Sequence, residues 1–334
     1  MSSQLAREVG ETAAGARRQI ATCADRLRAL GERLRARPPG FVITCARGSS
    51  DHAATYGKYL LETTVGRAVA SVGPSVASRY HHALALDGAL FVAVSQSGRS
   101  PDVLQLTTAA REGGALVVGM INDEASPLAA LCDVLIPLCA GEERSVAATK
   151  SCLLAGLAFL QLAAAWTGDA ALHDAVARAP EAFEAPAAWD LSPLASATSL
   201  YVVGRGLGLG AALELALKLK ETCGLHAEAF STAEVLHGPV ALVTPGFPIV
   251  ALGQDDETAD GNREVIARLA GLGAAVYSTL AVAGTTRLPT IAAPPQLAPL
   301  CQIQSGYLAL PALAAARGRQ VDAPPHLTKI TETV

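Results

Sequence analysis

The chain contains the same kind of segment twice, and this internal repeat constrains its fold more than any other feature. One apolar run leads into Arg47-Gly48, and another leads into Arg205-Gly206, 158 positions later. Gln96 and Gln254 each follow a further apolar run, and they are separated by the same 158 positions. A common offset at two well-separated motifs indicates that the chain consists of two copies of one structural unit.

The segment around residue 100 shows what each copy is built from. Leu90 to Val94 form an apolar run typical of a buried strand, and a short polar loop follows it. Ser100 suits a helix N-cap, Pro101 suits the first helical residue, and Gly113-Gly114 suits the helix end. Strand, loop and helix in this order predict an α/β fold with two tandem parallel sheets flanked by helices, flavodoxin-like or Rossmann-like.

The repeat also gives expected domain limits. Residues 1–35 are expected to form an N-terminal helical segment and residues 36–170 the first α/β domain. Residues 195–334 are expected to form the second domain, which ends in a C-terminal tail.

Composition and charge exclude several classes of protein. With 51% hydrophobic and 17% charged residues, the 334-residue chain belongs among folded globular proteins. A net charge of −4, with basic and acidic residues alternating in the N-terminal helix, argues against a nucleic-acid partner. The seven cysteines include no C-x-x-C pair, and the N-terminus has no apolar core typical of a signal peptide. We therefore expect a cytoplasmic protein with free thiols.

Residues 151–168 are nearly all apolar and long enough to be read as a membrane span. The segment is rich in alanine, and Gln161 interrupts it. We expect a helix buried inside the protein or at a subunit interface, where it would give a dimer apolar surface to bury, and no contact with a membrane.

The polar loop after the strand at residues 90–94 has the composition of an anion site. Ser95, Ser97 and Ser100 supply three hydroxyl donors around Gly98, and the loop faces a helix N-terminus. A single serine would favour an ordinary capped turn, whereas three around a glycine favour phosphate binding. The second copy carries acidic residues at the equivalent loop, Asp255 and Asp256, which would repel a phosphate. Only the first copy is therefore expected to bind the anion.

A charged stripe lies on the helix expected over residues 211–223. Glu214, Lys218 and Glu221 are spaced so that all three share one face. A solvated ladder of ion pairs is one interpretation. Leucines cover much of the remaining helix surface, so the stripe would instead lie in a largely buried helix, which suits a proton-transfer group. His237, before a Gly-Pro turn, would by itself be read as structural.

These motifs together resemble the sugar isomerase (SIS) family. The resemblance covers roughly residues 35–334 and includes "SQSGRS", "ERSVAATK", "LKLKETCGLHAEAF", "HGP" and the C-terminal "DAPPHLTKITETV". It is strongest to the isomerase half of glutamine:fructose-6-phosphate amidotransferase and to stand-alone amino-sugar-phosphate deaminases.

The resemblance implies roles for individual residues. The residues matching the phosphate-binding set are Ser50, Ser95, Gln96, Ser97 and Ser100. Val146 and Ala147 match a segment whose backbone contacts the sugar hydroxyls.

The catalytic roles implied by the resemblance fall on four further residues. Glu221 matches the base that moves a proton between C1 and C2, with Lys218 beside it. His237 matches a ring-opening histidine that reaches the site from a neighbouring subunit, and Lys329 matches a lysine that forms a Schiff base with the keto sugar. A homodimer with shared active sites is therefore expected, with no metal and no cofactor.

The expected reaction follows from what precedes the first strand. That strand is expected from Phe41, and Ser2 stands where the amidotransferase has a nucleophilic cysteine, so a glutamine-hydrolysing domain is not expected. We therefore expect glucosamine-6-phosphate deaminase activity, giving fructose 6-phosphate and ammonia. The alternatives are a galactosamine-6-phosphate deaminase, a phosphosugar aldose-ketose isomerase, and a non-catalytic phosphosugar sensor.

Overall fold

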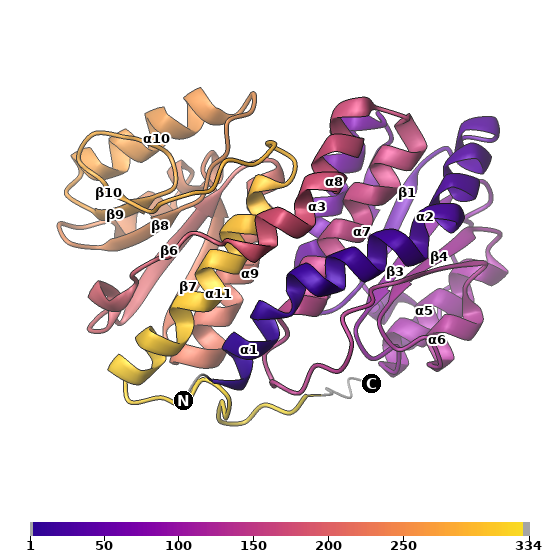
Figure 1. Ribbon diagram of the computed structural model, residues 1–334, viewed down its shortest axis with the longest axis horizontal. Helices are drawn as coiled ribbons and strands as arrows, with labels where there is room; N and C mark the ends of the chain where they lie inside the picture. The colour runs from indigo at the N-terminus through magenta and orange to yellow at the C-terminus, as the bar shows by residue number, and fades with distance from the viewer. Residues whose placement is uncertain (1–2, 330–334) are drawn as a thin grey trace. The chain divides into compact units, whose positions relative to one another are not determined.

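The computed structural model describes residues 3–329 (Figure 1). The chain divides into two compact units, which are described separately. The first-repeat unit comprises residues 11–143 and 150–180, together with Thr328 and Lys329. The second-repeat unit comprises residues 3–10, 144–149 and 181–327. The predicted α/β fold with tandem parallel sheets is confirmed, while the domain limits 1–35, 36–170 and 195–334 stay a prediction.

The first-repeat unit is built on a five-stranded parallel sheet of order β2-β1-β3-β4-β5. Its strands are β1 (Val42–Cys45), β2 (Val69–Ser71), β3 (Leu90–Ser95), β4 (Leu116–Ile121) and β5 (Val134–Pro137). Its helices are α2 (Thr12–Ala36), α3 (Ser49–Thr64), α4 (Ser75–Ser78), α5 (Pro101–Glu112), α6 (Pro127–Leu131) and α7 (Lys150–Thr167). Helix α8 (Ala170–Glu184) continues from this unit into the second.

Helices pack on both faces of this sheet, as a parallel sheet requires. Helix α7 packs against both α2 and α3, and all three helices also contact the sheet. Helix α5 covers the opposite face, where Phe91 of β3 and Val117 of β4 join Leu106 of α5 in one hydrophobic core. The central strand β3 is buried along its whole length, in agreement with its continuous apolar run.

The second-repeat unit contains an equivalent sheet of order β10-β9-β8-β6-β7. Its strands are β6 (Ser199–Gly204), β7 (His226–Ser231), β8 (Pro248–Ala251), β9 (Ala275–Ser278) and β10 (Thr286–Arg287). Its helical elements are α1 (Gln4–Gly10), η1 (Ser192–Leu194), α9 (Leu207–Cys223), η2 (Glu234–Leu236), η3 (Pro239–Leu242), α10 (Ala259–Gly271) and α11 (Ala298–Ala316). Helix α9 packs on β6 and β7 and against α11, and Ile266 of α10 joins the core with Ile249 of β8.

The two sheets have the same topology, which verifies the internal repeat at the level of structure. Read from β7, the second sheet has the order β7-β6-β8-β9-β10, which corresponds strand for strand to β2-β1-β3-β4-β5. The equivalent glycines even share a backbone conformation: Gly48 has φ 54° and ψ −131°, and Gly206 has φ 58° and ψ −126°. This left-handed region favours glycine, and each glycine immediately precedes a helix, α3 or α9.

Helix α7 corresponds to the apolar segment predicted over 151–168, and it is a core helix. It is long and apolar enough to pass a test for membrane spans, but 89% of that window is buried inside the protein. It packs against α2 and α3 of its own unit. The expectation that this helix offers a dimer apolar surface to bury is therefore wrong, because its surface is already covered within the unit.

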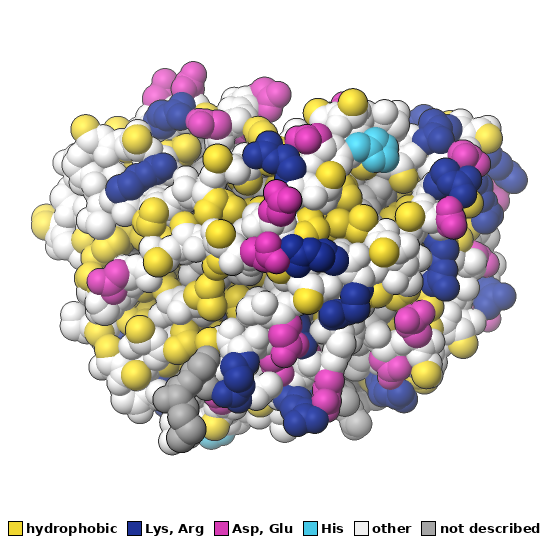
Figure 2. Space-filling model, in the orientation of Figure 1, with side chains coloured by type: hydrophobic (Ala, Val, Ile, Leu, Met, Phe, Trp, Pro, Cys, Tyr) yellow, Lys and Arg dark blue, Asp and Glu magenta, His cyan; other side chains and the backbone are white. Residues whose placement is uncertain are grey.

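The exposed side of α2 carries charges of both signs. Arg28 pairs with Asp25 at 2.7 Å and lies 4.0 Å from Glu32. Figure 2 shows basic and acidic side chains interspersed on the face of the molecule that it presents.

Candidate functional site

The residues singled out by sequence lie in two groups, one in each unit. The first-repeat unit contains the serine loop at residues 95–100, with Ser50 and Lys329. The second-repeat unit contains Lys218, Glu221 and His237, and also the short segment 144–149 that includes Val146 and Ala147.

The serine loop lies at the point in its sheet where ligands bind in folds of this class. The strand order places β1 beside β3, and their connections run to opposite sides, which in folds of this class is where ligands bind, outside the carboxyl ends of the two strands. Ser50, in the first turn of α3, follows β1, while Ser95 to Ser100 follow β3. The fold thus brings the two predicted parts of the phosphate site to one edge of the sheet.

Internal hydrogen bonds fix the conformation of the serine loop. The Ser95 Oγ accepts a hydrogen bond from the Gly98 N–H at 2.9 Å, and the Ser97 Oγ accepts one from the Arg99 N–H at 3.3 Å. Gly98 has φ +62°, and a Cβ added there would lie 2.1 Å from the Ser126 Oγ. Glycine is therefore required at this turn by both conformation and space.

The predicted start of α5 is confirmed. Ser100 is the N-cap residue and Pro101 the first helical residue, and Gly113 caps the other end. Within the described residues, the Ser100 side chain makes no capping hydrogen bond. Its hydroxyl can therefore serve a ligand at the start of this helix, where the helix dipole favours an anion.

An ion pair that sequence reasoning missed connects the two parts of the predicted phosphate site. The Arg47 Nε and Nη2 donate to the Asp102 Oδ2 at 2.8 and 2.5 Å. Asp102 is only 2% exposed and lies in the first turn of α5, whereas Arg47 belongs to the turn after β1. Because a buried carboxylate needs a partner, this pair ties the Ser50 turn to the Ser100 end of the loop. The repeated Arg-Gly motif was the signal available in the sequence.

Charges around the serine loop are balanced by arginines. Arg99 pairs with Asp123 at 2.8 Å, as Arg47 does with Asp102. Burial raises the pKa of the Asp51 carboxyl, next to Ser50, and the neighbouring His52 and Arg47 oppose this rise. The carboxylates near the loop would therefore repel an anion only weakly, because Asp102 and Asp123 are paired with arginines and the pKa of Asp51 is raised.

The equivalent loop of the second-repeat unit is organised by its own carboxylates. The Asp256 carboxylate accepts hydrogen bonds from the Gln254 side chain at 2.6 Å and from the Thr258 N–H at 2.8 Å. Asp255 pairs with Arg263 at 2.8 Å. These carboxylates occupy donors that a phosphate would otherwise use and add negative charge, which supports the expectation that only the first copy binds the anion.

The charged stripe on α9 is buried, as the leucine-rich pattern predicted. Glu214 and Lys218 are both 0% exposed, and the Glu221 side chain is 20% exposed. Lys218 forms an ion pair with Glu221, and its Nζ lies 3.6 Å from the Glu214 Oε1. The Tyr307 hydroxyl, from α11, donates to the Glu214 Oε1 at 2.7 Å. No sequence signal pointed to Tyr307, since it lies far along the chain from α9.

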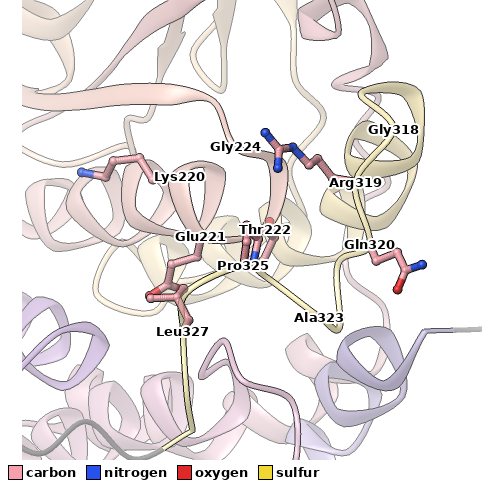
Figure 3. Close-up of a pocket in the computed structure, with 10 residues that line it drawn as sticks. All are labelled: Lys220, Glu221, Thr222, Gly224, Gly318, Arg319, Gln320, Ala323, Pro325 and Leu327. Carbon is pink, nitrogen blue, oxygen red and sulfur yellow. The ribbon is translucent and has the colours of Figure 1, made fainter.

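Glu221 reaches from this buried group into a pocket of about 510 Å³ (Figure 3). The pocket is lined by the end of α9 and by the segment that follows α11, from Gly318 to Leu327. In Figure 3 the Glu221 side chain points toward Pro325 and Leu327, whereas the Lys220 side chain points in a different direction, away from these two residues. Gly224, in the left-handed conformation, ends α9 at the pocket wall, where Arg319 packs closely against it. The arrangement gives one solvent-accessible carboxylate backed by a buried lysine.

His237 lies at the end of η2 and is exposed. It is not among the residues that line the Glu221 pocket.

The segment carrying Val146 and Ala147 is held by a buried carboxylate. Glu8 of α1 is 1% exposed and accepts hydrogen bonds from the Arg144 N–H at 2.6 Å and the Ser145 N–H at 3.1 Å. Ala147 is buried, and Val146 is partly exposed.

Lys329 lies in the first-repeat unit, next to a buried acid that sequence reasoning did not single out. Its Nζ donates to the Glu143 Oε2 at 2.9 Å. Among residues 3–329, no three histidine, cysteine, aspartate or glutamate side chains gather as a metal site would need.

With this geometry in place, comparison with known families identifies the class of protein. The SIS domain family profile matches residues 40–165 and 193–286, which are the two repeats, so the chain belongs to the SIS domain family. Curated relatives include the isomerizing glutamine–fructose-6-phosphate aminotransferases of Aeropyrum pernix and Sulfolobus acidocaldarius. The Aeropyrum pernix protein is 34% identical over a match that covers 87% of this chain and 51% of the relative. The Sulfolobus acidocaldarius protein is 35% identical over a match that covers 71% of this chain and 40% of the relative. This chain thus spans about half the length, or less, of these relatives.

Solved structures show the same fold. A protein from Silicibacter pomeroyi, provisionally described as a phosphosugar isomerase, matches with a TM-score of 0.91 and 41% identity, over 96% of this chain and 100% of that one. The C-terminal domain of glucosamine-fructose-6-phosphate aminotransferase from Francisella tularensis matches with a TM-score of 0.82 and 24% identity over 97% and 99%. Glucosamine-6-phosphate deaminase from Thermotoga maritima matches with a TM-score of 0.78 and 21% identity, over 99% of this chain and 100% of that one. At the last two identities the likeness concerns the fold alone.

Substitution of Ser97 tests the anion site. We expect Ser97→Ala to weaken binding of inorganic phosphate, measured by isothermal titration calorimetry, by about 10- to 150-fold. This corresponds to the roughly 1.5–3 kcal/mol of a hydrogen bond to a charged group. Ser97→Asp should weaken it further through like-charge repulsion. The matched control is Asp255→Ser, at the equivalent position of the second copy, which should leave phosphate binding unchanged. Unaltered affinity in both Ser97 variants would contradict the assignment.

Proposed function

We propose that this protein is a phosphosugar isomerase that interconverts the aldose and ketose forms of a hexose 6-phosphate. One observation carries the proposal: two repeats of identical topology have diverged, one toward a serine-rich loop and the other toward a buried lysine paired with a carboxylate that lines a pocket. Isomerisation of a sugar phosphate needs both, because the anion site positions the substrate and the carboxylate moves a proton. The 41% identical relative, matched over nearly the whole of both chains, supports the same class.

The serine loop is proposed to bind the phosphate. Ser95, Gln96, Ser97 and Ser100 would donate to its oxygens together with Ser50. The dipoles of α3 and α5 would further favour the anion, since both helices begin at this edge of the sheet. Val146 and Ala147 would contact the sugar hydroxyls through their backbone.

Glu221 is proposed as the base. It would take the proton from C2 of the open-chain aldose and return it to C1, while the hydroxyl proton of O2 passes to O1, and together these transfers turn the aldose into a ketose. The Lys218 ammonium, paired with Glu221, would stabilise the negative charge that develops on the sugar oxygens during this transfer.

His237 is proposed to open the sugar ring, because an imidazole both gives and takes a proton near neutral pH. It would transfer the proton of the anomeric hydroxyl to the ring oxygen. Its exposure suits a residue that acts on a substrate held by another subunit. Lys329 is proposed to form an imine with the ketose carbonyl.

Deamination of glucosamine 6-phosphate is the second candidate. It is considered because the Thermotoga maritima deaminase has the same fold, with 21% sequence identity. A galactosamine-6-phosphate deaminase and a non-catalytic phosphosugar sensor are further alternatives, and the buried Lys218–Glu221 pair argues against the sensor.

The purified chain should be incubated with a panel of hexose and hexosamine 6-phosphates, with ketose formation followed by NMR and ammonia by a coupled assay. An isomerase forms ketose phosphate and no ammonia. Equal amounts of ammonia and ketose phosphate from a hexosamine 6-phosphate would establish the deaminase instead. Binding without turnover across the panel would overturn both enzymatic assignments.

Glu221→Gln isolates the proton transfer. The amide preserves the shape of the side chain but does not accept a proton, so kcat should fall by about 10²–10⁴-fold with little change in KM. Incorporation of solvent deuterium at C1, measured by NMR, should fall in parallel. Glu228→Gln, an exposed position on β7, serves as the control and should retain normal turnover. Wild-type deuterium exchange in Glu221→Gln would assign the base to another residue.

We further propose that the active form is a homodimer in which His237 acts on the substrate of the partner subunit. Glu221→Gln and His237→Ala should each be inactive alone, and mixing them should restore part of the activity once subunits exchange. In a mixed dimer one site receives both intact residues and the other receives neither. Full activity as a monomer, or no recovery despite subunit exchange proven by mass spectrometry, would refute the shared site.

A further inference from the structure

Glu143 is a buried carboxylate with an unusually complete set of partners. Its side chain is fully buried, and its Oε2 accepts hydrogen bonds from the Lys329 Nζ at 2.9 Å and from the Ser151 Oγ at 2.7 Å. Its Oε1 accepts the Ser151 N–H at 3.1 Å. Both oxygens are therefore engaged, and the carboxylate does not rotate without breaking one of these contacts.

The surroundings of Glu143 hold its carboxylate in place. Ser151 is in the first turn of α7, where free backbone N–H groups and the helix dipole stabilise a negative charge. The neighbouring Lys150, only 1% exposed, donates to the Glu11 Oε2 at 2.5 Å and to the Glu142 carbonyl at 2.6 Å. The hydrogen bonds between Glu143 and Ser151 thus connect the residues that come just before and just after segment 144–149.

Lys329, from the C-terminal tail, contacts Glu143 at this point. Its side chain remains 23% exposed, in contrast to the fully buried Glu143. The amine is therefore held by a fixed, buried acceptor, while part of the Lys329 side chain remains exposed.

We propose that Glu143 is a positioning residue for Lys329: it holds the amine and takes up its proton when the imine with the ketose forms. This inference rests on the proposed function, in which Lys329 is the imine-forming lysine. Three observations carry it, namely the direct contact, the burial of Glu143 and its fixation by Ser151.

The chemistry balances with the groups present. The Lys329 ammonium transfers one proton to the Glu143 Oε2, to which it is already hydrogen-bonded, and the freed lone pair attacks the ketose carbonyl carbon. The new C–N bond forms and the carbonyl oxygen, after gaining two protons, leaves as water. Glu143 returns its proton in that dehydration, so the sum is ammonium plus ketone giving protonated imine plus water.

Glu143→Gln provides the test. The amide keeps the size of the side chain and can still accept a hydrogen bond from Ser151, but it has no negative charge and does not take a proton. We expect borohydride trapping of fructose 6-phosphate on Lys329, measured by mass spectrometry, to slow by about 10²-fold. The value of kcat should fall similarly while KM changes less than about twofold, because the phosphate loop is untouched. Glu142→Gln, the exposed neighbour, is the matched control and should trap normally.

Lys329→Arg separates failure of this inference from failure of the proposed function. Arginine keeps the ion pair with Glu143 but forms no imine, so this variant should lose both trapping and turnover. Hydrogen exchange of residues 318–327 should stay at the wild-type rate in Lys329→Arg and in Glu143→Gln, which distinguishes loss of chemistry from loss of the tail's docking. Wild-type trapping in Glu143→Gln would overturn the role of Glu143 alone. Full turnover in Lys329→Arg, with no trapping in the wild type, would overturn the imine and this inference with it.

Discussion

The position of β1 beside β3 is the constraint on which the rest of the first-repeat unit depends. Parallel strands joined by helices must send each connection over one face of the sheet, and here the connections leaving β1 and β3 diverge. The carboxyl ends of these two strands therefore form an edge where two helices, α3 and α5, begin together. The Arg47–Asp102 ion pair connects the turn after β1 to the first turn of α5 at this edge. The topology explains why the proposed anion site lies at this place, and the serines supply the hydroxyl donors that it would need.

The second repeat inherits the topology but not the site. Its equivalent turn begins with a glycine in the same conformation, yet Asp256 fills the loop with its own carboxylate. In exchange, α9 carries a lysine that is fully buried between two carboxylates. Burying these charges is costly unless each is paired and hydrogen-bonded, and Tyr307 supplies one of the required bonds to Glu214. Divergence after duplication thus accounts for two different sites on one fold.

Much of the fold could be predicted from the sequence because the relevant signals are local. The shared offset of 158 residues gave the duplication, and Ser100, Pro101 and Gly113 gave the limits of α5. Leucine spacing around Lys218 indicated that its helix would be buried, as it is. Of the two alternatives expected for helix α7, burial inside the protein is confirmed: α2 and α3 cover its apolar surface, which is not left for a partner.

The contacts that sequence reasoning missed all join segments far apart in the chain. Tyr307 meets Glu214 across 93 residues, and Lys329 meets Glu143 across 186. No periodicity or turn motif encodes such pairs, because they depend on how helices and the tail pack after the sheets have formed. The assignment of residues 144–149 to the second-repeat unit is equally invisible in sequence, since it depends on the buried Glu8 of α1.

The central claim is that the duplicated fold binds its anion in one repeat only, and backbone NMR tests it most directly. Titration of inorganic phosphate into the isotope-labelled 34.1 kDa chain should shift the amide signals of residues 48–50 and 95–102. The signals of residues 206–208 and 253–260, at the equivalent edge of the second sheet, should not move. Shifts in the second set, or in neither set, would contradict the division of roles between the two repeats.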